Sequence, residues 1–254
     1  MRGGGSPVAA VAAPGLPTEF LALAAVERSV MPEPRATAAG RRNAARTRED
    51  LLTVAADEFA ARGFFGARVD EIASRSLTTK RMIYYYFTDK RGLYTAVLEK
   101  AYADIREAEQ ALDLSALAPP QALQSLIRHT LEYHEAHPNL AKLVATENRL
   151  CAQNLKATHR QSALNQPIIR LIDDILDRGL ATGDFRRRPS ALELHLMMSG
   201  LAVFRITNAP TVEASFDIDI RTREHLDELV ATVQSMMLAW LRTPEDGAGQ
   251  APTS

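Results

Sequence analysis

The chain has 254 residues, 46% of them hydrophobic, and its 30 Lys or Arg nearly balance its 31 Asp or Glu, for a formal net charge of −1. This composition is typical of a soluble globular protein with a packed core. The single cysteine, Cys151, excludes an internal disulfide and a cysteine-rich metal site, and it is typical of a reducing compartment such as bacterial cytoplasm.

Residues 1–43 are rich in Ala, Gly and Pro and show no hydrophobic period, which predicts a mobile arm. Met31 is an alternative start of the chain. Arg35, Arg41, Arg42 and Arg46 gather just before the first expected helix. There they follow a phosphate backbone, enter a minor groove or form a solvated tail.

The charge is unevenly distributed along the chain. From Arg35 to Arg91 there are 12 Lys or Arg and 7 Asp or Glu, a net charge of +5, whereas the remainder holds 18 basic and 24 acidic residues. Proteins that bind duplex DNA need such a basic region, because neutralising phosphates and releasing their counterions supplies most of the non-specific affinity.

Four helices are predicted between Thr47 and about Leu112. We expect Thr47 to cap the first, Gly63 to stop it, and the second to run from about Val69 to Arg75. After the polar turn 76–79, a third short helix spans 80–87 and a long helix starts near 90. Two short helices joined by a tight turn, the second opening with Thr-Lys-Arg and rich in tyrosine, predict a unit that reads the DNA major groove.

The rest of the chain, about 94–242, is predicted to be helical. It shows no strand-like alternation and no phosphate-binding glycine loop, and the longest apolar stretch, around 194–204, is too short to span a bilayer. Two late segments, 189–207 and 222–241, have the apolar pattern of buried helices. We expect breaks at these residues: Pro119, Pro120, Pro138, Pro167, Gly179, Gly183, Pro189 and Pro210.

The segment 63–93 contains Gly63-Phe64, Ile72-Ala73, the run Ile-Tyr-Tyr-Tyr-Phe at 83–87, Lys90 and Leu93. In these residues it resembles the TetR family of bacterial regulators. The resemblance implies an all-α fold with a helix-turn-helix DNA-binding domain at 44–92, a helical ligand-binding and dimerisation domain at 93–243, and a tail at 244–254. It implies a cytoplasmic homodimer without a cofactor, a repressor that a small-molecule effector releases from a palindromic double-stranded DNA operator. The segment 121–148 more weakly resembles the subgroup of the pyrimidine-utilisation regulator.

Two positions depart from the family pattern. Leu77 stands where a glycine usually adopts a left-handed backbone, at a cost on the order of 1 kcal/mol. Ala67 and Arg68 replace the hydroxyl residues that commonly begin the second helix. We expect Arg68 to substitute for the phosphate contact that these hydroxyls would make.

The resemblance also assigns roles to residues of the DNA-binding domain. It makes Thr79 a helix cap and phosphate contact, and Lys80, Arg81 and Met82 the residues that face base edges. The tyrosines either pack, as Tyr84 would on the inner face, or donate hydroxyls to phosphates. The predicted DNA-binding set is Arg46, Arg68, Thr79, Lys80, Arg81, Met82, Tyr84, Tyr85, Tyr86 and Lys90.

Polar groups on apolar helices of the second domain need partners, either within the core or from a ligand. On this basis the candidate ligand-binding residues are Tyr133, Glu147, Asn148, His195, Met198 and Phe204, with His195 the strongest single candidate. The last two helices imply a dimer interface at Leu201, Val233, Met236, Met237 and Trp240. Ordinary intrachain core is compatible with the same stripe.

Three other interpretations remain open. His134 and His137 are three residues apart, and surface histidines are expected there instead of a metal site. A small all-helical hydrolase would use Cys151 or His159 with Glu147, although no catalytic motif supports an enzyme. A regulator that responds to a partner protein, or to no ligand, is the third alternative.

Overall fold

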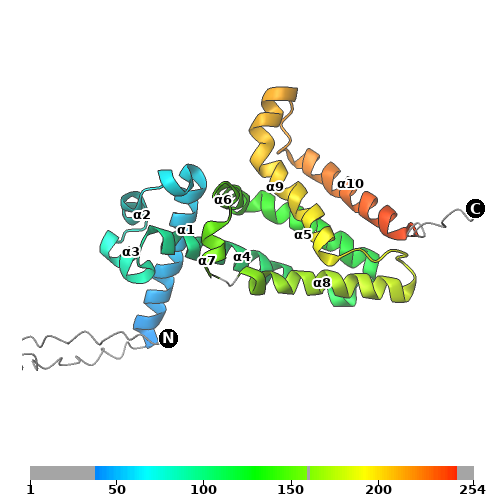
Figure 1. Cartoon of the computed structure of the whole chain (residues 1–254), viewed down its shortest axis with the longest axis horizontal. Helices are drawn as coiled ribbons and strands as arrows, with labels where there is room; N and C mark the ends of the chain where they lie inside the picture. Colours follow the sequence, from blue (N-terminus) through cyan, green and yellow to red (C-terminus); the bar gives the residue numbers. More distant parts are fainter. Residues whose placement is uncertain (1–37, 159–160, 245–254) are drawn as a thin grey trace, which may run out of the picture. The chain divides into compact units, whose positions relative to one another are not determined.

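The computed structural model describes residues 38–158 and 161–244. Within these ranges the chain is all-α, as predicted, with ten α-helices, one short 3-10 helix and no strand (Figure 1). No helix in the described ranges is long and apolar enough to cross a membrane.

The first four helices build one core. They are α1 (Ala38–Gly66), α2 (Val69–Arg75), α3 (Lys80–Phe87) and α4 (Lys90–Gln110). The bounds predicted for the second and third helices are confirmed, and so is the burial of Val69, Ile72 and Ala73. We call the core that these helices share the head core; it includes Leu51, Leu52, Phe59, Ile72, Ile83, Phe87, Leu93, Tyr94, Val97 and Leu98.

The start of the first helix was predicted too late. Helix α1 begins at Ala38, so Thr47 lies inside it and is not its cap. Alanine has the highest helix propensity, and the alanines around 38–45 extend the helix toward the N-terminus. Its end is confirmed: Gly63 has φ 67° and ψ 176°, a conformation that interrupts the helix and that only glycine adopts readily.

The turn between α2 and α3 carries backbone strain at the position where the family usually has glycine. Leu77 has φ 51°, in the left-handed region, and its side chain is 96% exposed. Burial therefore does not compensate for the backbone strain at this residue.

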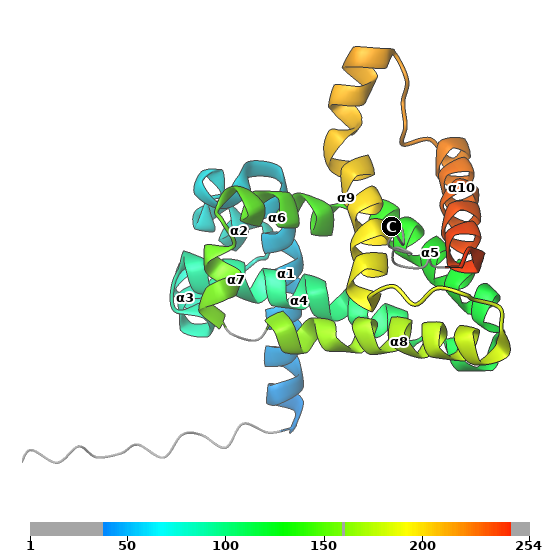
Figure 2. The ribbon, with the colours of Figure 1, turned by 45° about the vertical axis from the view of Figure 1, so that its right-hand side comes forward.

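The remaining elements are the 3-10 helix η2 (Leu114–Ala116), α5 (Pro119–Ala136), α6 (Pro138–Arg149), α7 (Gln153–Thr158), α8 (Gln161–Thr182), α9 (Ala191–Phe216) and α10 (Arg223–Arg242). A second core lies among α5, α8, α9 and α10 (Figure 2). Ser190 and Glu193 form a capping box at the start of α9, and the Thr222 hydroxyl caps α10.

Proline and glycine mark only some of the expected breaks. Pro119 and Pro138 begin α5 and α6, where a missing N–H does no harm. Pro167 and Pro210, however, lie inside α8 and α9, where tertiary packing overrides their low helix propensity. Gly179 also lies inside α8. A larger residue does not fit at this position, because a Cβ would come within 2.0 Å of the Phe185 ring.

Helix α4 belongs to both halves of the chain. Leu93, Tyr94, Val97 and Leu98 lie in the head core, together with Leu143 of α6. The same helix also packs against α8 and α5. The boundary expected at 92/93 therefore lies within a continuous helix, and the head core extends beyond it.

Candidate nucleic-acid interface and internal cavity

Helix α3 is fixed at its start and along its inner face. The Thr79 hydroxyl accepts a hydrogen bond from the Met82 N–H at 3.3 Å, which confirms Thr79 as the N-cap. Ile83 and Phe87, four residues apart, are buried in the head core. The opposite face of α3 is consequently held in a fixed orientation.

That opposite face carries the predicted contact residues. Lys80, Arg81, Tyr84 and Tyr85 share it by helical spacing, and all four are exposed. Tyr84 therefore does not lie on the inner face, because Ile83 takes the buried position. The two remaining candidates differ, since Met82 is exposed and Tyr86 is half-buried, with its ring 5.5 Å from that of Tyr85.

Lys80 is paired across the turn with Asp70 of α2. Its Nζ lies 3.1 Å from Oδ1 and 3.2 Å from Oδ2 of Asp70, and this contact raises the pKa of Lys80. Both side chains are solvent-exposed, so the pair contributes little to stability. A phosphate or a base edge can replace Asp70 as the partner of Lys80 at small cost.

Arg68 is the N-cap residue of α2, and its side chain is exposed. Its backbone N–H donates to Oε1 of the buried Glu58 at 3.1 Å. Glu58 also accepts from Arg62 Nε at 3.2 Å and lies 3.8 Å from Arg75 Nη1. The guanidinium of Arg68 therefore remains available, while its backbone anchors the helix.

Lys90 lies at the start of α4, but its ammonium is turned toward protein atoms. Nζ donates to the carbonyl oxygens of Ala67 at 2.6 Å and Phe65 at 3.2 Å, and it lies 5.4 Å from the centre of the Phe64 ring. Partial burial lowers the pKa of Lys90. These contacts indicate a structural role in place of the phosphate anchor that the resemblance implies.

The arginines of the arm are only partly described. Arg46 is exposed on α1, whereas Arg35 and the side chains of Arg41 and Arg42 lie outside the described residues. Arg48, two residues further along α1 than Arg46, places its guanidinium 5.2 Å from the centre of the Phe87 ring.

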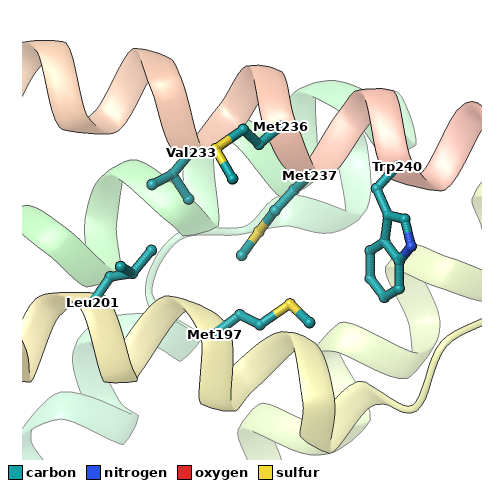
Figure 3. Close-up of a pocket in the computed structure, with 6 residues that line it drawn as sticks. All are labelled: Met197, Leu201, Val233, Met236, Met237 and Trp240. Atoms are coloured by element: carbon teal, nitrogen blue, oxygen red, sulfur yellow. The ribbon is translucent and has the colours of Figure 1, made fainter.

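Helices α9 and α10 form an apolar groove between them (Figure 3). Its volume is about 570 Å³. All five residues predicted for the dimer interface line it, together with Met197. Val233 and Met237 are also part of the chain's own core, whereas Met197, Leu201 and Met236 are exposed.

A separate cavity of about 330 Å³ lies among α4, α5, α6, α8 and α9. His195 contributes to its wall, and burial lowers the pKa of His195 to about 4. The lining residues are Tyr102, Ile105, Arg106, His134, Leu140, Val144, Asn165, Ile169, Leu192, His195, Leu196, Ser199 and Val203.

Arg106 is the charged residue of this wall, and only 6% of it is exposed. Its Nη2 lies 3.1 Å from Oε1 of Glu109, one turn further along α4. Arg106 Nε and Nη1 and Glu109 Oε2 have no hydrogen-bond partner among the described residues. Burial raises the pKa of Glu109 to about 7 and lowers that of Arg106.

The other predicted ligand residues do not line this cavity. Tyr133 lies in a smaller one of about 180 Å³, with its ring stacked 4.1 Å from that of His137. Met198 is buried in the second core, and Asn148 is exposed. Phe204 is 53% exposed and falls on the face of α9 that carries Met197 and Leu201, so it points away from this cavity.

Glu147 is buried, and protein groups already occupy its carboxylate. Oε1 accepts from the backbone N–H groups of Asn154 at 2.8 Å and Leu155 at 3.1 Å, and Oε2 accepts from Asn154 Nδ2 at 3.0 Å. Glu147 therefore holds the start of α7 and is not free to act as a base for Cys151, which is exposed. The alternative partner His159 lies outside the described residues.

The expectation of surface histidines is wrong for His134. It is 4% exposed, and its Nδ1 lies 2.8 Å from the Thr130 carbonyl oxygen, because residue 134 falls on the inner face of α5. His137 is exposed, with Nδ1 3.0 Å from the Tyr133 carbonyl oxygen. Among the described residues no three His, Cys, Asp or Glu side chains are placed to hold a metal ion.

The sequence reading missed Arg106, His134 and Tyr102 as cavity residues. Arg106 and Glu109 are three residues apart, which is the spacing of an ordinary surface ion pair on a helix. The sequence pattern therefore gave no indication that both side chains are buried. One signal was available: in α4, Tyr102, Ile105, Arg106 and Glu109 fall on one helical stripe, and Ile105 is apolar.

Two sequence families match the chain. The family described as "Bacterial regulatory proteins, tetR family" matches residues 51–97, and "Tetracyclin repressor-like, C-terminal domain" matches residues 119–237. The HTH-type transcriptional repressor NicS of Pseudomonas putida is 30% identical over 208 residues, which cover 82% of this chain and 98% of NicS. The HTH-type transcriptional regulator RutR of Escherichia coli K12 is 34% identical over 38% of this chain and 45% of its own length.

The fold is also found among solved structures. A tetR-family bacterial regulatory protein from Rhodococcus RHA1 has a TM-score of 0.61 at 17% identity, covering 77% of this chain and 97% of that one. The transcriptional regulator FadR from Bacillus subtilis, solved in complex with stearoyl-CoA, has a TM-score of 0.58 at 18% identity, with coverages of 75% and 97%.

Proposed function

Because the chain belongs to the TetR family of bacterial transcriptional regulators, we propose that it is a homodimeric repressor which a small-molecule effector releases from a two-fold symmetric operator. It acts in the cytoplasm, and its cycle consists of binding and conformational change without a chemical step. The observation that carries the proposal is the exposed face of α3, with Lys80, Arg81, Tyr84 and Tyr85, held against the head core by Ile83 and Phe87.

Lys80 and Arg81 are the side chains best suited to base recognition. Both residue types donate to guanine O6 and N7, and a good bidentate contact discriminates between bases by roughly 1–3 kcal/mol. The Thr79 and tyrosine hydroxyls are suited to phosphates, which position the helix. Arg68 and Arg46 supply further phosphate contacts from α2 and α1.

Dimerisation supplies a second α3 helix for contact with DNA. One short helix recognises few base pairs, and a two-fold dimer places two such helices about one turn of DNA apart. The groove between α9 and α10 supports this assembly, because Met197, Leu201 and Met236 expose large apolar side chains around it. Exposed apolar patches on a soluble protein mark interaction surfaces.

The release step follows from the continuity of α4. Its first turn follows α3 directly at Lys90, and its last turns place Arg106 in the wall of the 330 Å³ cavity. An effector that binds better to one orientation of α4 shifts the population toward that orientation. The two α3 helices then no longer fit adjacent major grooves.

The test is the recovery of an operator from host DNA. Purified protein is incubated with fragmented genomic DNA at two salt concentrations, and the bound fragments are sequenced. We expect one inverted-repeat site, retained at the higher salt and lost when Lys80 and Arg81 are both replaced by alanine. Binding without a common site, or an unchanged site in the double variant, would contradict the assignment of α3 as the reading helix.

A regulator that responds to a partner protein, and not to a metabolite, is the alternative within the same family. A metabolite that binds the folded state raises the melting temperature by mass action. A protein-responsive form would show no such rise with any compound and would release its operator only when the partner is added.

A further inference from the structure

We propose that the cavity among α4, α5, α6, α8 and α9 binds a compact organic carboxylate, with Arg106 as its counter-charge. The inference rests on the proposed function, since it names the chemical class of the effector. It is carried by the burial of Arg106, its unpaired N–H groups and the composition of the wall around it.

The guanidinium of Arg106 has unused hydrogen-bonding capacity. An arginine side chain has five N–H donors, and the contact with Glu109 involves Nη2 alone. Nε and Nη1 are buried and have no partner among the described residues. A buried donor without an acceptor is unfavourable by roughly 1–3 kcal/mol, and by more for a charged group. A ligand that supplies acceptors to Nε and Nη1 removes this cost, which favours its binding.

The wall favours a negative ligand. Arg106 is the one formally charged side chain among the thirteen lining residues, and none of them is Asp or Glu. Burial and the charge of Arg106 lower the pKa of both His134 and His195, so both imidazoles are neutral at pH 7. The cavity therefore presents one cation, neutral polar groups and apolar surface.

Glu109 does not remove this preference. It lies outside the lining, and only its Oε1 contacts Arg106. Burial raises its pKa to about 7, so near neutral pH the carboxyl readily takes up a proton. An incoming carboxylate then replaces the charge of Glu109 as the partner of Arg106, and the site stays close to neutral overall.

The size and the other walls limit the ligand to a small molecule with an apolar body. At about 330 Å³ the cavity is at the lower end of the range for ligand sites, roughly 300–1,000 Å³. Ile105, Leu140, Val144 and Ile169 provide apolar surface, and Asn165 and Tyr102 add polar groups. A compact acid with an apolar body fits this combination.

The experiment pairs each acid with its neutral amide. Full-length protein is heated with benzoate, cyclohexanecarboxylate or hexanoate, and in parallel with the corresponding amides, at equal concentration. We expect at least one acid to raise the Tm by about 4 °C or more while its amide does not. If no acid raises the Tm above its amide, the proposal is overturned.

Variants then locate the binding site. Arg106→Gln should weaken binding of the stabilising acid at least tenfold by calorimetry, and Arg106→Lys should weaken it less because the charge remains. Val203→Trp fills the cavity without altering its charge and should also abolish binding. It is the decisive variant if loss of Arg106 prevents folding. Undiminished binding in Val203→Trp would place the acid elsewhere and overturn the proposal.

Operator binding separates this inference from the proposed function. With the recovered operator as probe, the stabilising acid should release wild-type protein and leave the Val203→Trp variant bound. If the acid binds in the cavity but the protein recognises no operator, the carboxylate site stands and the proposed function fails. If operator binding is intact and no acid binds, the function stands and this inference fails.

Discussion

The ammonium nitrogen of Lys90, the first residue of α4, lies 2.6 Å from the carbonyl oxygen of Ala67, in the segment that joins α1 to α2. The same nitrogen donates to the Phe65 carbonyl oxygen at 3.2 Å. One side chain thereby ties the start of α4 to the end of α1. Because these carbonyls have no helical partner, the contact stabilises the head core and leaves few donors for DNA.

This contact predicts a stability defect for Lys90→Met. The methionine keeps much of the apolar stem but removes two charge-assisted hydrogen bonds, so we expect the free energy of unfolding to fall by about 1–3 kcal/mol in urea. Arg91→Met is the matched control, since Arg91 is exposed and should change stability by less than about 0.5 kcal/mol. Equal effects of the two changes would contradict the structural role of Lys90.

A second prediction concerns the strained turn at Leu77. Leu77→Gly removes the left-handed strain, and because the leucine side chain is almost fully exposed no packing is lost. We expect a gain of about 0.5–1 kcal/mol in the free energy of unfolding, reduced from the full strain by the flexibility of glycine in the unfolded chain. Leu77→Ala keeps the strain and should show no such gain. A destabilised glycine variant would refute the account.

The pair between Lys80 and Asp70 predicts tighter DNA binding for Asp70→Asn. The change frees Lys80 and removes a carboxylate beside the reading face. We expect affinity for the operator to rise about three- to tenfold at low salt, with a steeper salt dependence. Glu71→Gln removes a neighbouring exposed charge without freeing Lys80 and should have a smaller effect. If both variants behave alike, only net charge matters.

Met236 provides a test of the dimer interface. Met236→Lys places an ammonium at the groove between α9 and α10, where dimerisation would bury it at a high desolvation cost. Dimerisation should weaken at least 100-fold by sedimentation, with circular dichroism unchanged. Ala231→Lys, on an exposed face of α10 away from the groove, should remain dimeric. A dimeric Met236→Lys protein would place the interface elsewhere.

Glu109 makes stability depend on pH in a defined direction. Its folded-state pKa is raised to about 7 from an ordinary 4.5, so the folded protein keeps a proton that the unfolded chain loses. The contribution of this retained proton to the free energy of unfolding is complete below about pH 4.5 and is lost as the pH rises through 7. Relative to wild type, Glu109→Gln should gain on the order of 1–3 kcal/mol between pH 5 and 8.

The control for this pH prediction is the difference curve between the two proteins. Titration of His134 and His195, whose pKa values are lowered, acts in the opposite direction at lower pH and is common to both. It therefore cancels in the difference between wild type and Glu109→Gln. A difference that stays constant from pH 5 to 8 would mean that Glu109 does not retain a proton in the folded state.

Local sequence patterns predicted the helices of the DNA-binding domain far better than they predicted the residues of the cavity. The spacing of Val69, Ile72, Ile83 and Phe87 fixes which faces are buried, and Thr79 and Gly63 are chemical end signals that act over a few residues. Thr47 failed because a cap acts only if the preceding residues do not continue the helix. The alanines before it extend α1.

The cavity depends on contacts between distant helices, which no local pattern reveals. Arg106 and His134 come from α4 and α5, and their burial follows from how these helices pack against α9. Glu147 is the converse case: it was predicted to contact a ligand, and backbone N–H groups seven and eight residues away donate to its carboxylate. His195 alone of the six ligand candidates lines the larger cavity.

The continuity of α4 also limits how regulators of this design can be recombined. Exchanging sensing domains between relatives at residue 92 would cut the helix ahead of Leu93, Tyr94, Val97 and Leu98, and would supply the head core with foreign side chains. A hybrid biosensor should therefore keep the native sequence through at least Leu98. It must also retain the partner residue Leu143 of α6, so a functional module here is discontinuous in sequence.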